Sequence, residues 1–210
     1  MNGPSDFEEA FARCPLVAIL RGITPSEAAS VGDVLVDAGF ALIEVPLNSP
    51  EPLESIALLT KRLGSRAVVG AGTVLHASQV SAVQSAGGRL IVSPNTNTTV
   101  IEASAAAGLA SLPGYATVTE AFAAIDAGAH ALKLFPAESM TPAALRAQRA
   151  VIPISMPIIP VGGINVESFK PWVEAGASGF GLGSALYRAR VSAGEIAKAA
   201  SRLITGWKAL

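Results

Sequence analysis

Short apolar runs alternate along the chain with longer segments in which polar and apolar residues are mixed. Runs of this length, without the spacing of a helical face, predict buried strands, and the mixed segments between them predict amphipathic helices. Eight runs are expected to be strands: Leu16–Leu20, Ala41–Val45, Ala67–Ala71, Leu90–Ser93, Ala110–Leu112, Ala131–Phe135, Ile158–Val161 and Gly179–Leu182.

Helix signals fall between these runs. Capping residues are expected to start helices at Thr24-Pro25, Ser49-Pro50, Thr117, Thr141-Pro142 and Asn165. An Ala-Gly pair follows most helical segments, from Ala38-Gly39 to Ala175-Gly176, and glycine is the residue that most often closes a helix. Ahead of the first strand, Ser5 and Glu8 have capping-box spacing, which predicts a short extra helix at the N-terminus.

Near-continuous apolar strands separated by helices indicate a parallel sheet that is covered on both sides. Eight such units predict an α/β fold, a small single-domain (β/α)8 TIM barrel over residues 1–210 with an extra N-terminal helix. The main alternative is a flavodoxin-like open sheet, which would use fewer strands and leave two units over.

Composition narrows the classes of function. The 15 basic and 16 acidic residues nearly balance and the basic ones are scattered, so neither nucleic acid nor a membrane is expected as a partner. A single cysteine excludes an internal disulfide, and the two histidines form no metal-ligand pattern, so neither metal nor cofactor is expected. The acidic N-terminus lacks an apolar signal region and no run reaches membrane-spanning length, which predicts a soluble cytoplasmic protein.

The strand around Lys133 carries the strongest chemical signal. Lysines elsewhere fall on predicted helices, whereas Lys133 interrupts an apolar strand, where alternation points it into the barrel and sends Leu132 and Leu134 outward. Burial disfavours the charged ammonium, and a neutral amine can attack a carbonyl to form a Schiff base. The alternative is a buried lysine held in a plain ion pair with Glu44.

Glu44 lies near the end of another apolar strand. If the carboxyl group is desolvated, its pKa should rise towards the range of a general acid or base. The alternative is a glutamate at the end of a strand, turned towards solvent.

Active sites of such barrels lie at the carboxyl ends of the strands. The loops after the last two strands contain Gly162, Gly163, Gly183 and Ser184, whose backbone N–H groups are expected to bind phosphate. The alternative is that these glycines only form tight turns. Arg21 and Thr73 end other strands and are candidates for holding a substrate carboxylate. Either could instead tie down a loop.

Several motifs resemble the KDPG/KHG aldolase family in order from about Pro15 to Arg188, among them Glu-Val-Pro-Leu-Asn-Ser-Pro, Val-Gly-Ala-Gly-Thr-Val-Leu, Lys-Leu-Phe-Pro-Ala-Glu and Val-Gly-Gly-Ile. These are class I aldolases of 2-keto-3-deoxy sugar acid phosphates. The resemblance implies a homotrimeric barrel in which Lys133 forms the Schiff base and Glu44 shuttles protons. It also implies that Thr73 binds the carboxylate, that Gly162, Gly163 and Ser184 bind the 6-phosphate, and that Pro94 and Phe135 line the pocket.

Two positions depart from the gluconate-type members of that family. Many of those carry arginine in place of Asn48 and threonine in place of Val161, and both residues here resemble the galactonate branch. The two substrates differ in the configuration at C4, and losing the threonine hydroxyl removes a hydrogen-bond partner from that region. The expected reaction is reversible cleavage of 2-dehydro-3-deoxy-6-phosphogalactonate to pyruvate and D-glyceraldehyde 3-phosphate. Alternatives are the gluconate epimer, dual specificity, or a non-catalytic barrel that binds sugar phosphates.

Overall fold

The computed structural model describes residues 3–210. Its strands are β1 (Leu16–Ile19), β2 (Leu42–Pro46), β3 (Val68–Gly72), β4 (Leu90–Val92), β5 (Ala110–Leu112), β6 (Gly114–Tyr115), β7 (Leu132–Leu134), β8 (Ile158–Pro160) and β9 (Phe180–Leu182). Its α-helices are α1 (Gly3–Arg13), α2 (Pro25–Ala38), α3 (Pro52–Leu63), α4 (Ala77–Ser85), α5 (Thr98–Ala106), α6 (Val118–Asp126), α7 (Pro142–Arg149), α8 (Val166–Glu174) and α9 (Ala193–Lys208). Two short 3₁₀ turns are η1 (Gly64–Arg66) and η2 (Ala137–Ser139).

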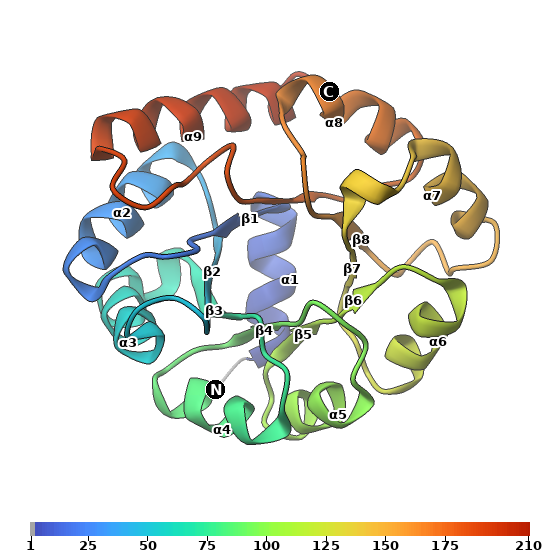
Figure 1. Ribbon diagram of the computed structural model, residues 1–210, viewed down its shortest axis with the longest axis horizontal. Coiled ribbons are helices and arrows are strands. Elements are labelled where there is room, and N and C mark those ends of the chain that lie inside the picture. The colour runs from blue at the N-terminus through green and yellow to red at the C-terminus, as the bar shows by residue number, and fades with distance from the viewer. Residues whose placement is uncertain (1–2) are drawn as a thin grey trace.

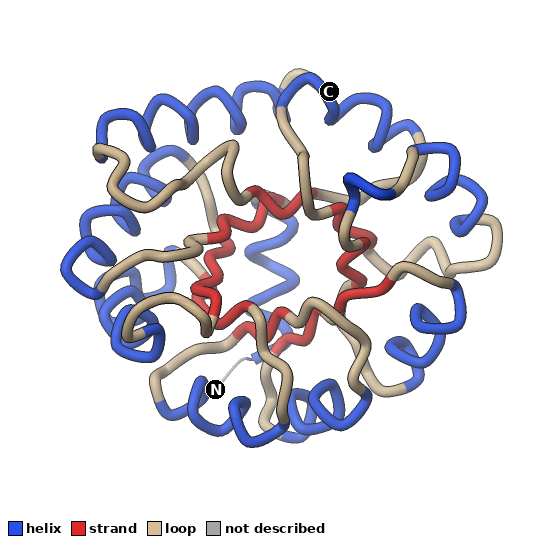
Figure 2. The backbone as a smooth tube through the Cα atoms, in the orientation of Figure 1, coloured by secondary structure: helices blue, strands red, loops and turns tan. Residues whose placement is uncertain are grey.

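All paired strands run parallel and curl around one axis, with the helices outside them (Figure 2). A six-stranded sheet has the order β5-β4-β3-β2-β1-β9, and a three-stranded sheet has the order β6-β7-β8. Neighbours in space are therefore neighbours along the chain, except where β9 returns to β1. The strand order does not reverse as it would in a flavodoxin-like sheet, so that alternative is wrong.

Residues 3–210 contain nine strands, where the sequence predicted eight. Pro113 separates β5 from β6, and proline has no N–H to donate to a ladder. Its carbonyl still accepts a hydrogen bond from the Lys133 backbone N–H at 2.9 Å, so one extended segment reaches both sheets. At the opposite side, a single parallel bridge joins Val161 to Gly181.

Most helix starts agree with the sequence prediction. Thr24, Thr117 and Thr141 cap α2, α6 and α7. The start of α3 was predicted wrongly, because the helix begins at Pro52 and the Ser49 hydroxyl instead accepts the Gly22 backbone N–H at 3.0 Å.

The N-terminal helix α1 begins at Gly3, so Ser5 lies inside the helix and is not its cap. Figure 1 shows α1 behind the ring of strands, seen through its centre. Phe7 meets the edge of His130, just before β7, at a centroid distance of 6.4 Å. Asp6 pairs with Arg89, just before β4. Both contacts are with residues that precede strands, so α1 covers the amino-terminal end of the strands and leaves the other end open.

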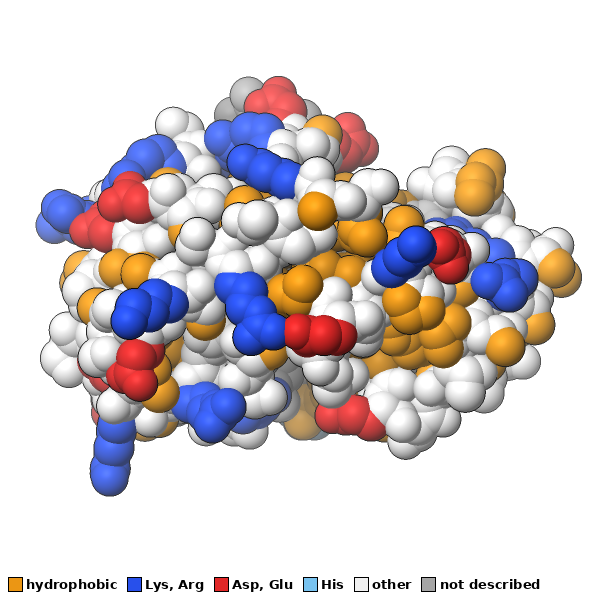
Figure 3. All heavy atoms as spheres, turned by 90° about the horizontal axis from the view of Figure 1, so that it is seen from above, with side chains coloured by type: hydrophobic (Ala, Val, Ile, Leu, Met, Phe, Trp, Pro, Cys, Tyr) orange, Lys and Arg blue, Asp and Glu red, His pale blue; other side chains and the backbone are white. Residues whose placement is uncertain are grey.

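The outward faces of the strands pack under the helices. Leu132 and Leu134 are fully buried on either side of Lys133, as strand alternation predicts. On the surface, Figure 3 shows basic and acidic side chains interspersed with hydrophobic atoms on the face over α8 and α9. Within residues 3–210, none of the helices combines the length and apolarity that a bilayer crossing requires.

Candidate active site

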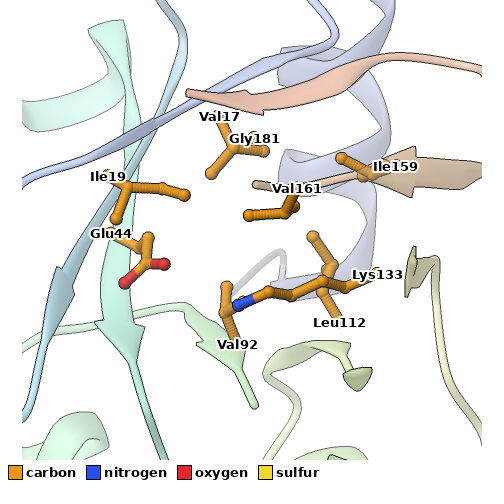
Figure 4. Close-up of a pocket in the computed structure, with 9 residues that line it drawn as sticks. All are labelled: Val17, Ile19, Glu44, Val92, Leu112, Lys133, Ile159, Val161 and Gly181. Carbon is orange, nitrogen blue, oxygen red and sulfur yellow. The ribbon is translucent and has the colours of Figure 1, made fainter. Parts of the chain in front are cut away.

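A narrow cavity lies on the axis of the strands, with Lys133 and Glu44 in its wall (Figure 4). The other lining residues come from five strands and the start of a loop: Val17, Ile19, Val92, Leu112, Ile159, Val161 and Gly181. Apart from the amine and the carboxyl group, every lining side chain is apolar. Charges inside such a cavity are therefore weakly solvated.

Lys133 points into this cavity from β7 (Figure 4), and only 6% of its surface is exposed. Its Nζ lies 4.7 Å from the centre of the Phe135 ring. Burial lowers the pKa of the Lys133 amine, the Glu44 charge opposes this, and the Arg21 charge lowers the pKa further. A larger share of the amine is therefore neutral at physiological pH than in an exposed lysine.

Glu44 projects from β2 into the same cavity (Figure 4) and is 1% exposed. Burial raises the pKa of its carboxyl group to about 7, although Lys133 and Arg21 partly oppose the rise. Its Oε2 is buried without a hydrogen-bond partner. The ion pairs among residues 6–210 include neither Glu44 nor Lys133. Two alternatives raised by the sequence are therefore wrong. Lys133 is not held in a plain ion pair with Glu44, and Glu44 is not turned towards solvent.

Gly72, the last residue of β3, makes room for this carboxyl group. A Cβ at position 72 would lie 1.5 Å from Glu44 Oε2 and 2.3 Å from its carboxyl carbon, so the carboxyl group could not keep its present position. The sequence analysis did not single out Gly72, although it precedes Thr73 in a motif that drew attention. In the sequence, only the spacing of Gly70 and Gly72 indicates its role, because two glycines on the same face of a strand leave room for a neighbouring side chain.

Arg21 and Thr73 both follow strand ends at the open side. Arg21 is exposed, and its Nη1 donates to Asn48 Oδ1 at 2.6 Å. Its charge influences both Lys133 and Glu44, so the guanidinium lies within electrostatic range of the cavity. Thr73 has a φ of +57°, a left-handed conformation that is costly for a residue with a Cβ. Such strain is typical of functional positions, and it fixes the direction of the Thr73 side chain.

The glycine-rich loops follow β8 and β9, which the Val161–Gly181 bridge makes neighbours. Gly162 and Gly163 have φ values of +113° and +65°, and Glu138 packs against both. A Cβ at Gly183 would meet nothing within 4 Å, so the backbone there faces open space. Ser184 next to it is exposed. The two loops therefore present accessible backbone at one end of the fold, as phosphate binding would require.

The remaining predicted residues divide into two groups. Val161 lines the cavity and Phe135 contacts the Lys133 amine. Pro94 does not line the cavity, and its backbone instead lies against Gly114. Apart from Val161, the apolar residues of the cavity wall were not predicted from the sequence, although period-2 alternation could have identified them once the inward face of each strand was known.

The chain resembles known proteins in both its sequence and its fold. Residues 7–201 match the family described as KDPG and KHG aldolase. The chain is 43% identical to 2-dehydro-3-deoxy-6-phosphogalactonate aldolase of Escherichia coli K12, over 93% of this chain and 96% of that one. It is 30% identical to 2-dehydro-3-deoxy-phosphogluconate aldolase of Zymomonas mobilis, over 80% of each. A solved structure described as native KDPGal has a TM-score of 0.92 and 43% identity, and the match covers 94% of this chain and 96% of that one.

Proposed function

The chain belongs to the KDPG and KHG aldolase family, and from this premise we propose that it cleaves 2-dehydro-3-deoxy-6-phosphogalactonate reversibly to pyruvate and D-glyceraldehyde 3-phosphate. It is a carbon–carbon lyase of the class I type. The observation that carries the proposal is the placement of one buried lysine and one buried carboxyl group in a single apolar cavity.

We assign the nucleophile to Lys133. Its neutral amine attacks the C2 ketone of the substrate and forms a carbinolamine. Loss of water then gives an iminium ion, whose positive nitrogen accepts the electron pair released when the C3–C4 bond breaks. Glyceraldehyde 3-phosphate leaves, the enamine is protonated at C3, and hydrolysis of the iminium releases pyruvate and restores the amine.

Glu44 is the proton shuttle in this scheme. A carboxyl group with a pKa of about 7 is present in both protonation states near neutral pH. It can therefore donate a proton as water leaves the carbinolamine and, directly or through water, take the proton from the C4 hydroxyl as the carbon–carbon bond breaks. Its unpartnered Oε2 is available for both transfers.

The substrate's two anionic ends fit the open side of the fold. We place its carboxylate at Arg21 and Thr73, and its phosphate at Gly162, Gly163, Gly183 and Ser184. Phosphate binding far from the reacting carbons would orient them over Lys133. Phe135, whose ring centre lies 4.7 Å from the Lys133 amine, flanks this path.

The galactonate epimer is favoured by two observations. The chain is 43% identical to the galactonate-type relative and 30% identical to the gluconate-type one. Val161, which lines the cavity, offers no hydroxyl there. The gluconate epimer is the second candidate, because a missing hydrogen bond weakens binding without blocking it.

A non-catalytic sugar-phosphate sensor is disfavoured, because a sensor needs neither Lys133 nor Glu44. Keeping both groups buried costs folding free energy. We also propose that the two sheets form one closed (β/α)8 barrel and a single domain, supported by the hydrogen bonds at Pro113 and the Val161–Gly181 bridge. Assembly into a cytoplasmic homotrimer is proposed from the family resemblance.

Steady-state cleavage of the two pure epimers tests this function, with pyruvate release as the readout. We expect a higher kcat/KM on the galactonate epimer, and no turnover of either by Lys133→Ala. Equal rates on both epimers would support dual specificity, whereas no pyruvate from either would refute the assignment. Lys170→Ala, which removes an exposed lysine of α8, is the matched control and should retain activity.

A further inference from the structure

The proposed phosphate site contains no cation. Gly162, Gly163, Gly183 and Ser184 offer only backbone N–H groups and one hydroxyl, while the phosphate ester carries close to two negative charges at neutral pH. Glu138, which is exposed and packs against both glycines of the loop after β8, adds a further negative charge. Electrostatics therefore calls for a positive group near these loops.

Arg188 is held beside the loop after β9. Its Nε donates to the backbone carbonyl of Ser184 at 3.2 Å. This hydrogen bond uses the inner nitrogen of the guanidinium and leaves both terminal nitrogens available. The side chain is exposed, and Arg188 takes part in no ion pair among residues 6–210.

A surface cavity lies next to Arg188, where the two glycine-rich loops continue into the rest of the chain. Arg188 itself lines it, together with Asn165, which caps α8 after the first loop, and Ala185, which directly follows Ser184. The rest of its wall comes from α8 and α9: Val166, Glu167, Ala199, Arg202 and Leu203. Arg202 lines the same cavity but is engaged by Glu167, as an ion pair on the outer surface. Of the two arginines in this cavity, Arg202 is paired with a carboxylate, and Arg188 has no carboxylate partner among residues 6–210.

From this geometry, and resting on the proposed function, we propose that Arg188 binds the phosphate group of the substrate. The guanidinium supplies the positive charge that the glycine-rich loops lack, and its terminal nitrogens can donate to two phosphate oxygens at once. The hydrogen bond from Arg188 Nε to the Ser184 carbonyl already holds the side chain in place. Phosphate binding therefore costs less side-chain entropy than it would with a free arginine.

Kinetics on two substrates test the proposal. Arg188→Ala should raise the KM for the 6-phosphorylated keto acid at least tenfold, with kcat changed less than twofold. The kcat/KM for the same keto acid without its phosphate should stay within twofold of wild type. Arg188→Lys, which keeps the charge without the fork, should recover part of the loss. Arg190→Ala removes an exposed arginine two residues away and should behave as wild type.

An unchanged KM in Arg188→Ala would overturn the proposal. So would an equal loss on both substrates, because that would assign Arg188 to the structure of the loop and not to the phosphate.

Calorimetric titration with inorganic phosphate gives a readout that needs no turnover. Arg188→Ala should weaken phosphate binding at least tenfold relative to wild type and Arg190→Ala. If the protein proved not to be an aldolase, this titration would still decide the role of Arg188. Equal phosphate affinities in all three proteins would exclude it.

Discussion

The burial of the Glu44 carboxyl group affects both the stability of the fold and the pKa of the group. Its side chain is almost fully buried, one carboxyl oxygen has no hydrogen-bond partner, and the charges that influence it belong to Lys133 and Arg21. A carboxylate in this position is costly to the fold, and the same cost raises its pKa to about 7, where it can both give and take a proton. The folding penalty and the catalytic property have one cause.

Glu44→Gln should therefore stabilise the protein, and by an amount that depends on pH. The native carboxyl group holds its proton up to about pH 7, whereas the unfolded one loses it near pH 4.5. The native state binds more protons in that window, so wild-type stability falls as pH rises through it. The advantage of the variant should grow from about pH 4.5 to 7, reaching on the order of 3 kcal/mol, and then level off. Urea unfolding at several pH values measures it, and a pH-independent difference would contradict the buried, protonated state.

Gly72 offers a second test at the scale of one residue. Gly72→Ala places a methyl group on the position of the Glu44 carboxyl group and must push that group aside. Because the reacting groups need precise placement, kcat should fall about a hundredfold. Gly194→Ala, at an exposed position of α9 where the added Cβ would meet nothing within 4 Å, is the matched control and should retain kcat. Retained kcat in Gly72→Ala would show that the carboxyl group is not needed in its present position.

At the scale of elements, a half-buried ion pair contributes to the attachment of α1, beside the buried side chain of Phe7. Arg89 pairs with Asp6 and also donates to the carbonyl of Ala67 at 3.0 Å. Arg89→Ala should lower the free energy of unfolding by about 1–3 kcal/mol, since it leaves these acceptors unpaired. Arg62→Ala, which breaks a more exposed pair with Asp33, should lower the free energy of unfolding less than Arg89→Ala does. Thermal unfolding compares the two, and equal losses would show that α1 is not held in this way.

Elements with a strong local pattern could be predicted from the sequence. The side chains of Thr117 and Thr141 accept backbone N–H groups of their own helices, and at α2 the Glu27 side chain accepts the Thr24 N–H, so these starts depend on short-range chemistry. Ser49 failed as a cap because a distant partner, the Gly22 N–H, takes its hydroxyl. The division of the fifth strand at Pro113 likewise depends on which neighbours each half pairs with, and that is a tertiary property.

The candidate site shows the same limit. Lys133 and Glu44 could be identified because charged residues are rare in apolar strands. Gly72 could not, since its role arises only when several strands meet around one axis. Most of the apolar lining likewise requires that the inward face of each strand be known. Arg188 was likewise missed, because nothing in the sequence shows that its Nε bonds to the Ser184 carbonyl.

At the scale of the whole molecule, the two ends of the strands have different tasks. α1 covers the amino-terminal end, while the loops at the carboxyl-terminal end hold the candidate binding groups (Figure 1). Mutations that loosen α1 should therefore change stability more than catalysis.

The proposed trimer predicts a particle of three 21.3 kDa chains. Large apolar side chains such as Ile154, which is 88% exposed, and Val151 are candidates to be covered by other copies. Light scattering after size-exclusion chromatography measures the mass directly. A mass of one chain at micromolar concentration would refute the trimer and leave the site within one chain unaffected.

Chemical capture of the Schiff base tests the central claim, that the Lys133 amine attacks a keto acid. The protein is incubated with pyruvate, reduced with borohydride, digested, and mapped by mass spectrometry. We expect a reduced pyruvate adduct on the peptide that contains Lys133. The adduct should be lost in Lys133→Ala and absent from the peptides of Lys61, Lys170, Lys198 and Lys208. No adduct, or an adduct on one of those other lysines, would contradict it.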